Sequence, residues 1–453
     1  MRISSIICFG LLFCYSVGNA QVITTFAGND CVRADSGNNI PATAACIGLP
    51  GAGSFDAMGN YYFAEDFGGS RVEKVNTDGI ITTVAGNGGH GFSGDGGPAT
   101  DASLVWAYAI VDAAGNIYIP DRDNYRVRKV DASTGIIHTI AGNGSRGHSG
   151  DGGPATDASI YPFSVCVDSH GNVYISDSST WVRKISATGI ITTIAGSGFQ
   201  GYTGSGIPAT SSGLYNSGGL CVDVLGNVLV GNGDGWLMKI DVSTGIITAI
   251  AGTGTRGPYL SDGLQATNSQ LNPYAIAIDL QGNIFIADYG VGNSRVLKID
   301  TFGIVRTIAG TGTDGYSGDG GLGTAAQLCN PEGVAIDVCG NVYIADDANR
   351  RIRKVTFNPS CTPTDSVSLN TTTVNINKQV SVYPNPAHDE VNVTAVNKIT
   401  GITITNLLGQ QVRSRQYSSA AVRVDMQGLA AGVYFMKVTD EYGMQTVERI
   451  VKE

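Results

Sequence analysis

The sequence has few of the residues that enzymes use for acid–base or metal chemistry. It contains five histidines among 453 residues. It has no Cys-x-x-Cys pair, no His-Glu-x-x-His segment, no Gly-x-Ser-x-Gly elbow and no Gly-x-x-x-x-Gly-Lys loop. The sequence therefore shows none of the common motifs of zinc sites, serine hydrolases and P-loop nucleotide binders. We therefore assign no catalytic or metal-ligating residues from the sequence, and binding is favoured over catalysis.

The sequence also lacks a cluster of basic residues. Its 28 Lys and Arg are outnumbered by 38 Asp and Glu, which gives a formal net charge of −10. Affinity for nucleic acid depends mainly on Lys and Arg contacts that release counterions from phosphates. DNA, RNA and anionic membrane surfaces are therefore disfavoured as partners.

Only one long apolar run occurs, at the N-terminus. An early cation precedes an apolar stretch over residues 6–17, and small residues follow it. This order predicts a signal peptide at residues 1–20. The run is shorter than the ~20 residues of a membrane span, so no transmembrane segment is expected. A lipoprotein that uses Cys14 is an alternative, but Phe13 is bulky where that cleavage needs a small residue.

Seven of the nine cysteines follow the predicted signal peptide, which is an odd number. Export permits disulfides, and one between Cys31 and Cys46 would close a surface loop. Cys166 and Cys221 interrupt apolar segments, which is equally consistent with buried free thiols. The spacing does not decide the pairing.

Three sequence patterns each recur six times with a period of about 56 residues. Such self-similarity predicts a repeat architecture. Asp-x-x-Gly-Asn begins at Asp56, Asp112, Asp168, Asp223, Asp279 and Asp337. A five-residue segment with Lys at its fourth position occupies 71–75, 126–130, 181–185, 236–240, 295–299 and 351–355. An Ile/Thr-rich run ending in Ala-Gly closes at Gly28, Gly86, Gly142, Gly196, Gly252 and Gly310.

Each repeat is predicted to form four short β-strands, because β-branched residues are enriched and glycine-bearing turns separate the segments. One such unit cannot bury both of its faces, whereas radial packing of six units can. The sequence therefore predicts an all-β, six-bladed propeller over residues 21–357. The sixth unit lacks its fourth strand, and residues 22–28 supply a strand without a blade. We expect this N-terminal strand to complete the last blade and close the ring.

The repeat units resemble NHL repeats, most clearly from Cys329 through Asp346 to Val355. The long connections at 93–100 and 149–156 are similar to those of bacterial and teneurin-type NHL propellers. Members of this group bind proteins, RNA or small molecules, so the resemblance implies a fold without deciding a function.

Two kinds of acid could have a chemical role or a structural one. The Asp of Asp-x-x-Gly-Asn is expected to cap a turn in which Gly has positive φ. A second acid precedes each basic segment, and a ring of such carboxylates near the axis could hold a metal, but we favour turn capping because one residue type recurs. This second set is Asp66, Asp121, Asp177, Asp288 and Asp346, with Asn232 in the fourth unit.

The Ser-Gly-Asp-Gly-Gly loops are a possible calcium site. They carry Asp95, Asp151 and Asp319 among glycines, and oxygen-rich loops of this kind can bind calcium. None has the closing Glu of an EF-hand. We therefore expect no cofactor, with calcium as the alternative.

Ligand binding is expected where the repeats differ. The long connections and the turns between second and third strands should share one face of the propeller, which is the natural binding surface. Just before the first strands the repeats diverge, and aromatic, amide and acidic side chains meet there. A sugar or a peptide segment would suit this set, although the aromatics could equally plug an empty channel. The candidate ligand-binding residues are Trp106, Tyr108, Tyr161, Phe163, Tyr274 and Glu332.

The repeat ends before residue 358. Residues 358–379 are rich in Ser, Thr, Asn and Pro and are predicted to be a linker. Residues 380–453 predict a small Ig-like β-sandwich of alternating strands, with separate strands at 390–394 and 401–405 among them. Tyr383-Pro-Asn-Pro386, Asn406-Leu-Leu-Gly409 and the segment 429–434 resemble the C-terminal sorting domain of type IX secretion substrates in Bacteroidota. The resemblance implies export, recognition by that secretion machinery, and release or attachment at the cell surface.

These patterns favour a secreted or cell-surface binding module that recognises a glycan or a protein or peptide ligand on the loop-rich propeller face. We expect it to act as a monomer. Two alternatives are a metal-assisted lyase or hydrolase at the channel mouth and a structural or adhesion protein of the cell surface.

Overall fold

The computed structural model describes residues 21–29, 38–66, 70–106, 108–178, 180–215, 218–255, 257, 262–290, 292–357, 380–383, 387–406, 411–430, 432–441 and 445–452. The predicted signal peptide and linker lie outside these residues. The chain divides into two compact units, residues 1–366 and 367–453.

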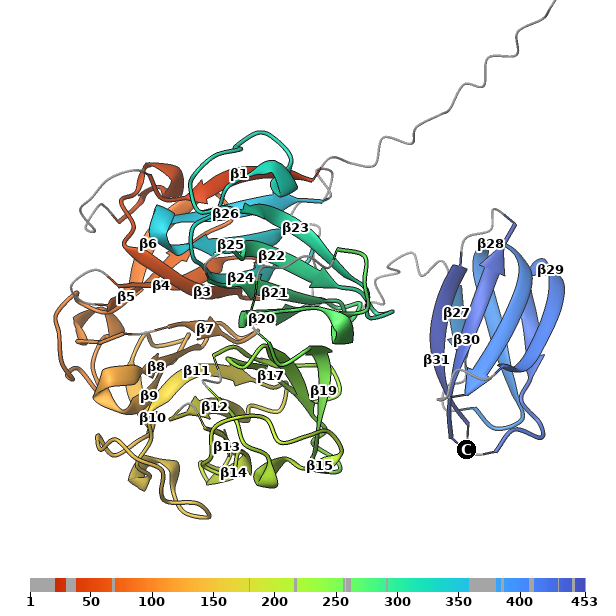
Figure 1. Cartoon of the computed structure of the whole chain (residues 1–453), viewed down its shortest axis with the longest axis horizontal. Coiled ribbons are helices and arrows are strands. Elements are labelled where there is room, and N and C mark those ends of the chain that lie inside the picture. Colours follow the sequence, from red (N-terminus) through yellow and green to blue (C-terminus); the bar gives the residue numbers. More distant parts are fainter. Residues whose placement is uncertain are drawn as a thin grey trace, which may run out of the picture. The chain divides into compact units, whose positions relative to one another are not determined.

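The first unit is built from six antiparallel sheets arranged in a ring (Figure 1), which confirms the predicted six-bladed propeller. The first strand of each blade faces the centre and the fourth lies at the periphery. Blades 1 to 3 contain β3 (Leu49–Phe55) to β6 (Ile80–Ala85), β7 (Ile110–Val111) to β10 (Ile137–Ala141), and β11 (Pro162–Val167) to β14 (Ile191–Ala195). Blades 4 and 5 contain β16 (Leu220–Val222) to β19 (Ile246–Gly252) and β20 (Pro273–Ile278) to β23 (Val305–Gly312).

The second and third strands of blades 1 to 5 lie between the strands just named. They are β4 (Tyr61–Asp66), β5 (Ser70–Val75), β8 (Ile117–Asp121), β9 (Arg126–Val130), β12 (Val173–Asp177), β13 (Trp181–Ile185), β17 (Val228–Asn232), β18 (Trp236–Ile240), β21 (Ile284–Asp288) and β22 (Ser294–Ile299).

The N-terminal strand closes the ring as predicted. Blade 6 has the order β1-β26-β25-β24, with β1 (Val22–Ala27), β26 (Arg351–Thr356), β25 (Val342–Asp346) and β24 (Pro331–Ile336). Val22 is opposite Thr356 and Thr24 is opposite Lys354 in the antiparallel ladder. The side chain of Ile23 is fully buried and belongs to the core cluster between blades 5 and 6. The two ends of the repeat array therefore share one sheet.

The connections between blades contain structure that the sequence did not predict. Each makes a short antiparallel pairing with the outer strand of the next blade and then forms one turn of 3₁₀-helix whose first residue is buried. These pairings cover outer strand edges that would otherwise expose unpaired backbone groups. The elements are β2 (Ile40–Pro41), β15 (Ile207–Pro208), η1 (Ala42–Ala44), η2 (Ala99–Asp101), η4 (Ala155–Asp157), η5 (Ala209–Ser211), η6 (Ala266–Asn268) and η7 (Gly323–Ala325). Two further 3₁₀ turns, η3 (Arg122–Asn124) and η8 (Asp347–Asn349), follow second strands.

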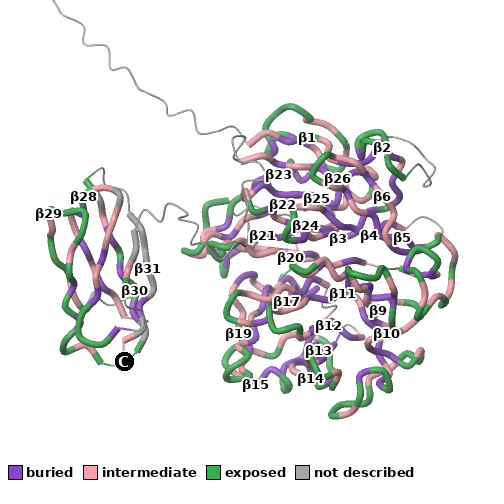
Figure 2. Tube along the Cα trace, turned by 180° about the vertical axis from the view of Figure 1, so that it is seen from behind, coloured by how far each residue is buried: buried purple, intermediate pink, exposed green. Residues whose placement is uncertain are grey.

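Buried residues lie along the inner parts of the blades and exposed ones along the connections (Figure 2). Cys166 and Cys221 are free thiols, and Cys46 and Cys339 are each disulfide-bonded. Cys31, which was one possible partner of Cys46, lies outside the described residues. None of the helices in the described part of the chain is both long and apolar enough to cross a membrane.

The second unit is a small β domain formed by one sheet that curls. Its strands are β27 (Val380–Tyr383), β28 (Glu390–Asn406), β29 (Gln411–Asp425), β30 (Gly432–Asp440) and β31 (Gln445–Lys452). We predicted separate strands at 390–394 and 401–405, but both belong to β28. The register of β28 against β29 shifts between Thr394 and Ile399, so one strand bends where we expected a turn. Val391, Ile402 and Met436 share the core of this domain.

Candidate functional site

The first repeated acid caps a turn, as predicted. The Oδ1 atom of Asp56 accepts 2.9 Å hydrogen bonds from the backbone N–H groups of Met58 and Asn60. Its Oδ2 atom accepts a 2.7 Å bond from the side-chain amide of Asn60. Gly59 has a φ of 81°, which supplies the backbone conformation that the turn requires. The same three bonds recur in the other five blades.

The second repeated acid fixes the chain where it enters the first strand of its own blade. Asp121 accepts a 2.9 Å bond from the N–H of Val105, and Asp177 accepts a 2.6 Å bond from the N–H of Tyr161. Asn232, Asp288 and Asp346 do the same in blades 4, 5 and 6.

Blade 1 departs from the predicted set. There the Oε2 atom of Glu65, not Asp66, accepts the 2.6 Å bond from Gly48. Glu65 follows Asp56 by nine positions, as Asp121 follows Asp112, so Glu65 is the blade 1 equivalent of the second acids and Asp66 lies one position beyond it. The second acids therefore hold the chain where it enters the channel mouth.

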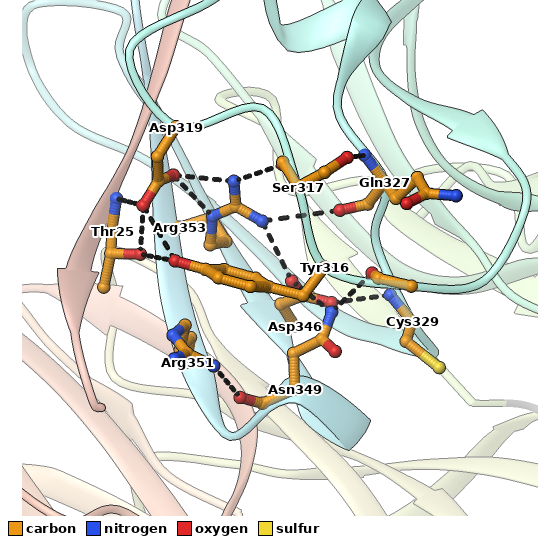
Figure 3. A network of polar contacts seen from close by, with 11 residues as sticks. Thr25, Tyr316, Ser317, Asp319, Gln327, Cys329, Asp346, Asn349, Arg351 and Arg353 are labelled. Carbon is orange, nitrogen blue, oxygen red and sulfur yellow. Dashed lines mark hydrogen bonds and ion pairs between the residues drawn. The ribbon is translucent and has the colours of Figure 1, made fainter. Parts of the chain in front are cut away.

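The acids of the Ser-Gly-Asp-Gly-Gly loops belong to a buried ion-pair network, which Figure 3 shows in blade 6. The guanidinium of Arg353 is fully buried and lies 2.7 Å from Asp319 and 3.2 Å from Asp346. Asp319 also accepts a 2.6 Å bond from the hydroxyl of Thr25 in β1. Arg128 with Asp95 and Asp121 repeats the arrangement in blade 2, and Arg183 with Asp151 and Asp177 repeats it in blade 3.

These loop acids thus have arginine and threonine partners, which gives them a structural role. Among the described residues, no three His, Cys, Asp or Glu side chains are grouped so that they could hold a metal ion.

Blade 5 contains the second acid without the arginine. Leu297 occupies the position that Arg353 has in blade 6. The side chain of Asp288 is fully buried, and its Oδ2 atom has no hydrogen-bond partner in the described structure. Burial raises the pKa of Asp288 to about 7. Blade 4 avoids this cost because Asn232 replaces the acid.

The first strands of the six blades enclose a cavity of about 510 Å³. Four of the six candidate ligand-binding residues line it, namely Tyr108, Phe163, Tyr274 and Glu332. The wall below them consists largely of small residues such as Ala52, Ser54, Gly219 and Ala277, and this leaves the channel open.

Two tyrosines meet over the channel. Tyr108 comes from blade 2 and Tyr274 from blade 5, which are opposite in a ring of six, and their hydroxyl oxygens are 3.3 Å apart. Gly51 of blade 1 makes room for this pair, because a Cβ atom there would lie 2.6 Å from the ring of Tyr108. The ring of Tyr274 packs on Tyr289, with ring centroids 4.8 Å apart. Burial raises the pKa of Tyr274 to about 12, so both hydroxyls are hydrogen-bond donors at neutral pH.

Glu332 is the acid of the channel wall. Burial, with a smaller contribution from the nearby Asp347, raises its pKa to about 8. Burial likewise raises the pKa of Asp347 to about 7. A hydrogen bond from Tyr108 acts in the opposite direction on Glu332 but does not offset burial. At neutral pH, Glu332 is therefore mainly a neutral carboxylic acid that can donate as well as accept a hydrogen bond.

Arg122 is the cavity residue that our sequence analysis missed. It begins η3, and its guanidinium carbon lies 4.2 Å from the ring centroid of Phe163 and 5.2 Å from that of Tyr161. Its Nε atom donates a 3.2 Å hydrogen bond to the hydroxyl of Tyr161. The exposed ring of Trp106 lies 5.9 Å from the same guanidinium carbon. Tyr161 and Trp106 do not line the cavity, but they surround the cation that does.

A sequence signal for Arg122 existed. We compared the repeats only before their first strands, whereas Arg122, Tyr289 and Asp347 each directly follow a second repeated acid. The repeats differ at that position too, and the same comparison there would have found all three.

Comparison with known proteins identifies both units. Residues 381–453 match the family model of the secretion system C-terminal sorting domain, and residues 143–201 match that of the teneurin NHL domain. The chain carries a teneurin-like NHL propeller and a type IX sorting domain.

The sequence relatives of the NHL propeller are larger proteins. It is similar to Protein SUPPRESSOR OF QUENCHING 1, chloroplastic, of Arabidopsis thaliana, with 26% identity over 346 residues that cover 72% of this chain and 32% of the relative. Human Teneurin-1 is 28% identical over 297 residues, which cover 57% of this chain and 11% of Teneurin-1. The chain thus spans a third or less of the length of these relatives.

Solved structures share the fold. A structural genomics protein from Bacteroides thetaiotaomicron aligns with a TM-score of 0.53 at 21% identity, covering 74% of this chain and 76% of that one. An auxiliary nutrient binding protein from Bacteroides ovatus aligns with a TM-score of 0.52 at 16% identity and the same coverage. At these identities the likeness establishes the propeller fold alone.

The sorting domain indicates that the protein is secreted or lies at the cell surface, and that it interacts with the type IX secretion machinery. The predicted localisation is thus confirmed.

Replacing Asp288 by Asn should remove a pH-dependent loss of stability. In the folded protein the carboxyl group of Asp288 stays protonated up to about pH 7, whereas the usual pKa of this group is 3.8. Because the folded state binds more protons between these values, stability falls as pH rises from about 4 to about 7. At pH 8, ionisation of Asp288 lowers the free energy of unfolding by at most about 4 kcal/mol. We expect Asp288→Asn to be more stable than the wild type at pH 8, measured by urea unfolding across this pH range.

The matched control is Asp346→Asn, which removes the partner of Arg353 at the equivalent position. It should destabilise by about 3–5 kcal/mol because a buried guanidinium loses an ion pair. An Asp288→Asn variant that keeps the wild-type pH dependence would contradict the assignment.

Proposed function

We propose that this protein is a secreted or surface-attached binding module whose NHL propeller recognises a glycan or a protein or peptide segment at the channel mouth. In this proposal residues 21–357 form the binding domain, residues 358–379 a linker, and residues 380–453 the secretion address. Trp106, Tyr108, Tyr161, Phe163, Tyr274 and Glu332 form or support the site, together with Arg122.

The cavity is the observation that carries this proposal. Residues that only plugged the channel would leave little space, yet about 510 Å³ remains beside the Tyr108–Tyr274 pair. A volume of this size accommodates a small ligand or a few residues of a larger one. The mouth offers aromatic faces at Phe163 and Tyr274 and hydrogen-bonding groups at Glu332. Aromatic rings next to a few convergent polar groups are typical of sites for sugars and peptides.

The repeated scaffold also supports binding at this face. Asp121, Asp177 and Asp346 have both carboxyl oxygens occupied by backbone or side-chain partners. The residues at the mouth, in contrast, differ between blades. One solved propeller of this fold is described as an auxiliary nutrient binding protein, so the fold is compatible with a binding role.

Removing the two aromatic faces should abolish ligand recognition. We expect the wild-type protein to bind glycans or peptides on arrays and the Phe163→Ala/Tyr274→Ala double variant to lose at least about tenfold in affinity, since buried aromatic anchors dominate binding energy. Phe302→Ala is the control, because Phe302 is exposed on a turn between third and fourth strands, at the opposite face.

The melting temperature of each variant shows whether it is folded. The absence of any wild-type array signal would favour a structural or adhesion role instead. Equal binding by the double variant would place the ligand elsewhere on the propeller.

A further inference from the structure

Arg122 differs from the other arginines that are held inside the propeller. Arg128, Arg183 and Arg353 are fully buried, and each has two aspartate partners. Arg122 is half-buried and lines the cavity, and it makes no ion pair with any residue in the described structure. Among the described residues that line the cavity, it is the only basic one. A cation that faces a cavity without an acidic partner is suited to an anionic ligand.

The surroundings of Arg122 fix its orientation. The rings of Phe163, Tyr161 and Trp106 lie around its guanidinium, and the Nε–H group donates to Tyr161. These contacts leave the two terminal nitrogens without a hydrogen-bond partner among the described residues. A guanidinium whose Nε is held in place can present both terminal N–H groups to one planar acid group. Stacking on aromatic rings also lowers the entropy that binding would cost, because the long side chain is already ordered.

The acid of the cavity wall, Glu332, does not neutralise Arg122. Glu332 faces Tyr108, Tyr274, Tyr289 and Asp347, and no basic side chain contributes to its pKa. With a pKa of about 8 it is mainly uncharged at neutral pH. The cavity wall therefore carries one positive charge, beside hydroxyl and carboxylic acid groups that can donate hydrogen bonds.

We propose that Arg122 is a carboxylate-binding residue, and that the ligand of the channel mouth carries an acid group next to a segment that stacks on Phe163. This inference rests on the proposed function and adds the charge of the ligand to it. A monoanionic carboxylate matches the planar guanidinium and costs less to desolvate than a doubly charged phosphate. The acid group would belong either to a uronate sugar or to the C-terminus of a peptide.

The test compares charged probes with neutral ones of the same shape. The sugar probes are trigalacturonate and its methyl ester, and the peptide probes are Gly-Phe-Ala with a free and with an amidated C-terminus. Binding to the full-length protein is measured by calorimetry at pH 7. We expect at least one acid probe to bind about tenfold or more tightly than its neutral partner, and the probe pair that shows this difference identifies the source of the acid group.

Variants assign the difference to Arg122. Arg122→Gln should bind the acid and its neutral partner equally, and Arg122→Lys should retain only part of the difference because it lacks the planar fork. Arg146→Gln is the matched control: Arg146 lies 4.5 Å from the ring centroid of Tyr161 but is exposed and outside the cavity wall. It should keep the wild-type preference.

The pH dependence gives a second measurement. Ionisation of Glu332 above pH 8 places a negative charge in the cavity wall, so affinity for the acid probe should fall severalfold between about pH 7 and pH 9. Glu332→Gln should lose most of this decrease.

Three results would overturn the role of Arg122: neutral probes that bind as tightly as acids, acid probes that do not bind at all, or an Arg122→Gln variant that keeps the preference. Neutral sugars or peptides that bind in a Phe163- and Tyr274-dependent manner would leave the proposed function intact in each case.

Discussion

The antiparallel pairing of β1 with β26 holds the propeller together, because it joins the two ends of the repeat array in one sheet. Its effect reaches the binding face through a continuous set of polar contacts. Thr25 of β1 donates to Asp319, which pairs with Arg353, and Arg353 pairs with Asp346. Asp346 in turn accepts the N–H of Cys329, just before the strand that carries Glu332. Closure of the ring and the position of an acid at the mouth are therefore physically linked.

The repeats divide their residues between two tasks. Positions that recur in every blade serve the scaffold: Asp56 and its equivalents cap turns, and Asp121 and its equivalents hold the entering chain. Positions that differ between blades meet at the channel mouth, where the shared scaffold does not dictate the side chain. This division lets a regular ring carry an irregular site, with a cation from blade 2 and an acid from blade 6 in the same cavity wall. Blade 5 departs from the repeat, because it has the buried acid Asp288 but lacks the arginine that would pair with it. One carboxyl oxygen of Asp288 is therefore left without a hydrogen-bond partner in the described structure.

Much of the fold could be predicted because it depends on periodic signals. Six copies of Asp-x-x-Gly-Asn indicated the number of blades, and the missing fourth strand of the last repeat indicated closure by residues 22–28, of which 22–27 form β1. The 3₁₀ turns of the connections could not be predicted, because their backbone pairing with the next blade depends on tertiary contacts. The role of Glu65 could have been predicted from spacing, because Glu65 follows Asp56 by nine positions, as Asp121 follows Asp112, but we chose the neighbouring aspartate instead.

The candidate site could be predicted only in part. Tyr108, Phe163, Tyr274 and Glu332 were found because we compared the repeats where the first strands begin. The last three are the second residues of β11, β20 and β24. Arg122 follows a second strand and lies 41 positions before Phe163 in the sequence, so only the fold brings the two together. The raised pKa of Glu332 likewise arises from burial in the assembled channel, which no local pattern encodes.

Amide hydrogen exchange of residues 22–27 tests the closure of the ring most directly. Pairing with β26 predicts that these amides exchange as slowly as those of residues 351–356 and become accessible together with them, since both would require the same opening of blade 6. Exchange of residues 22–27 at the rate of an exposed loop, while residues 351–356 stay protected, would show that the N-terminal strand does not close the propeller.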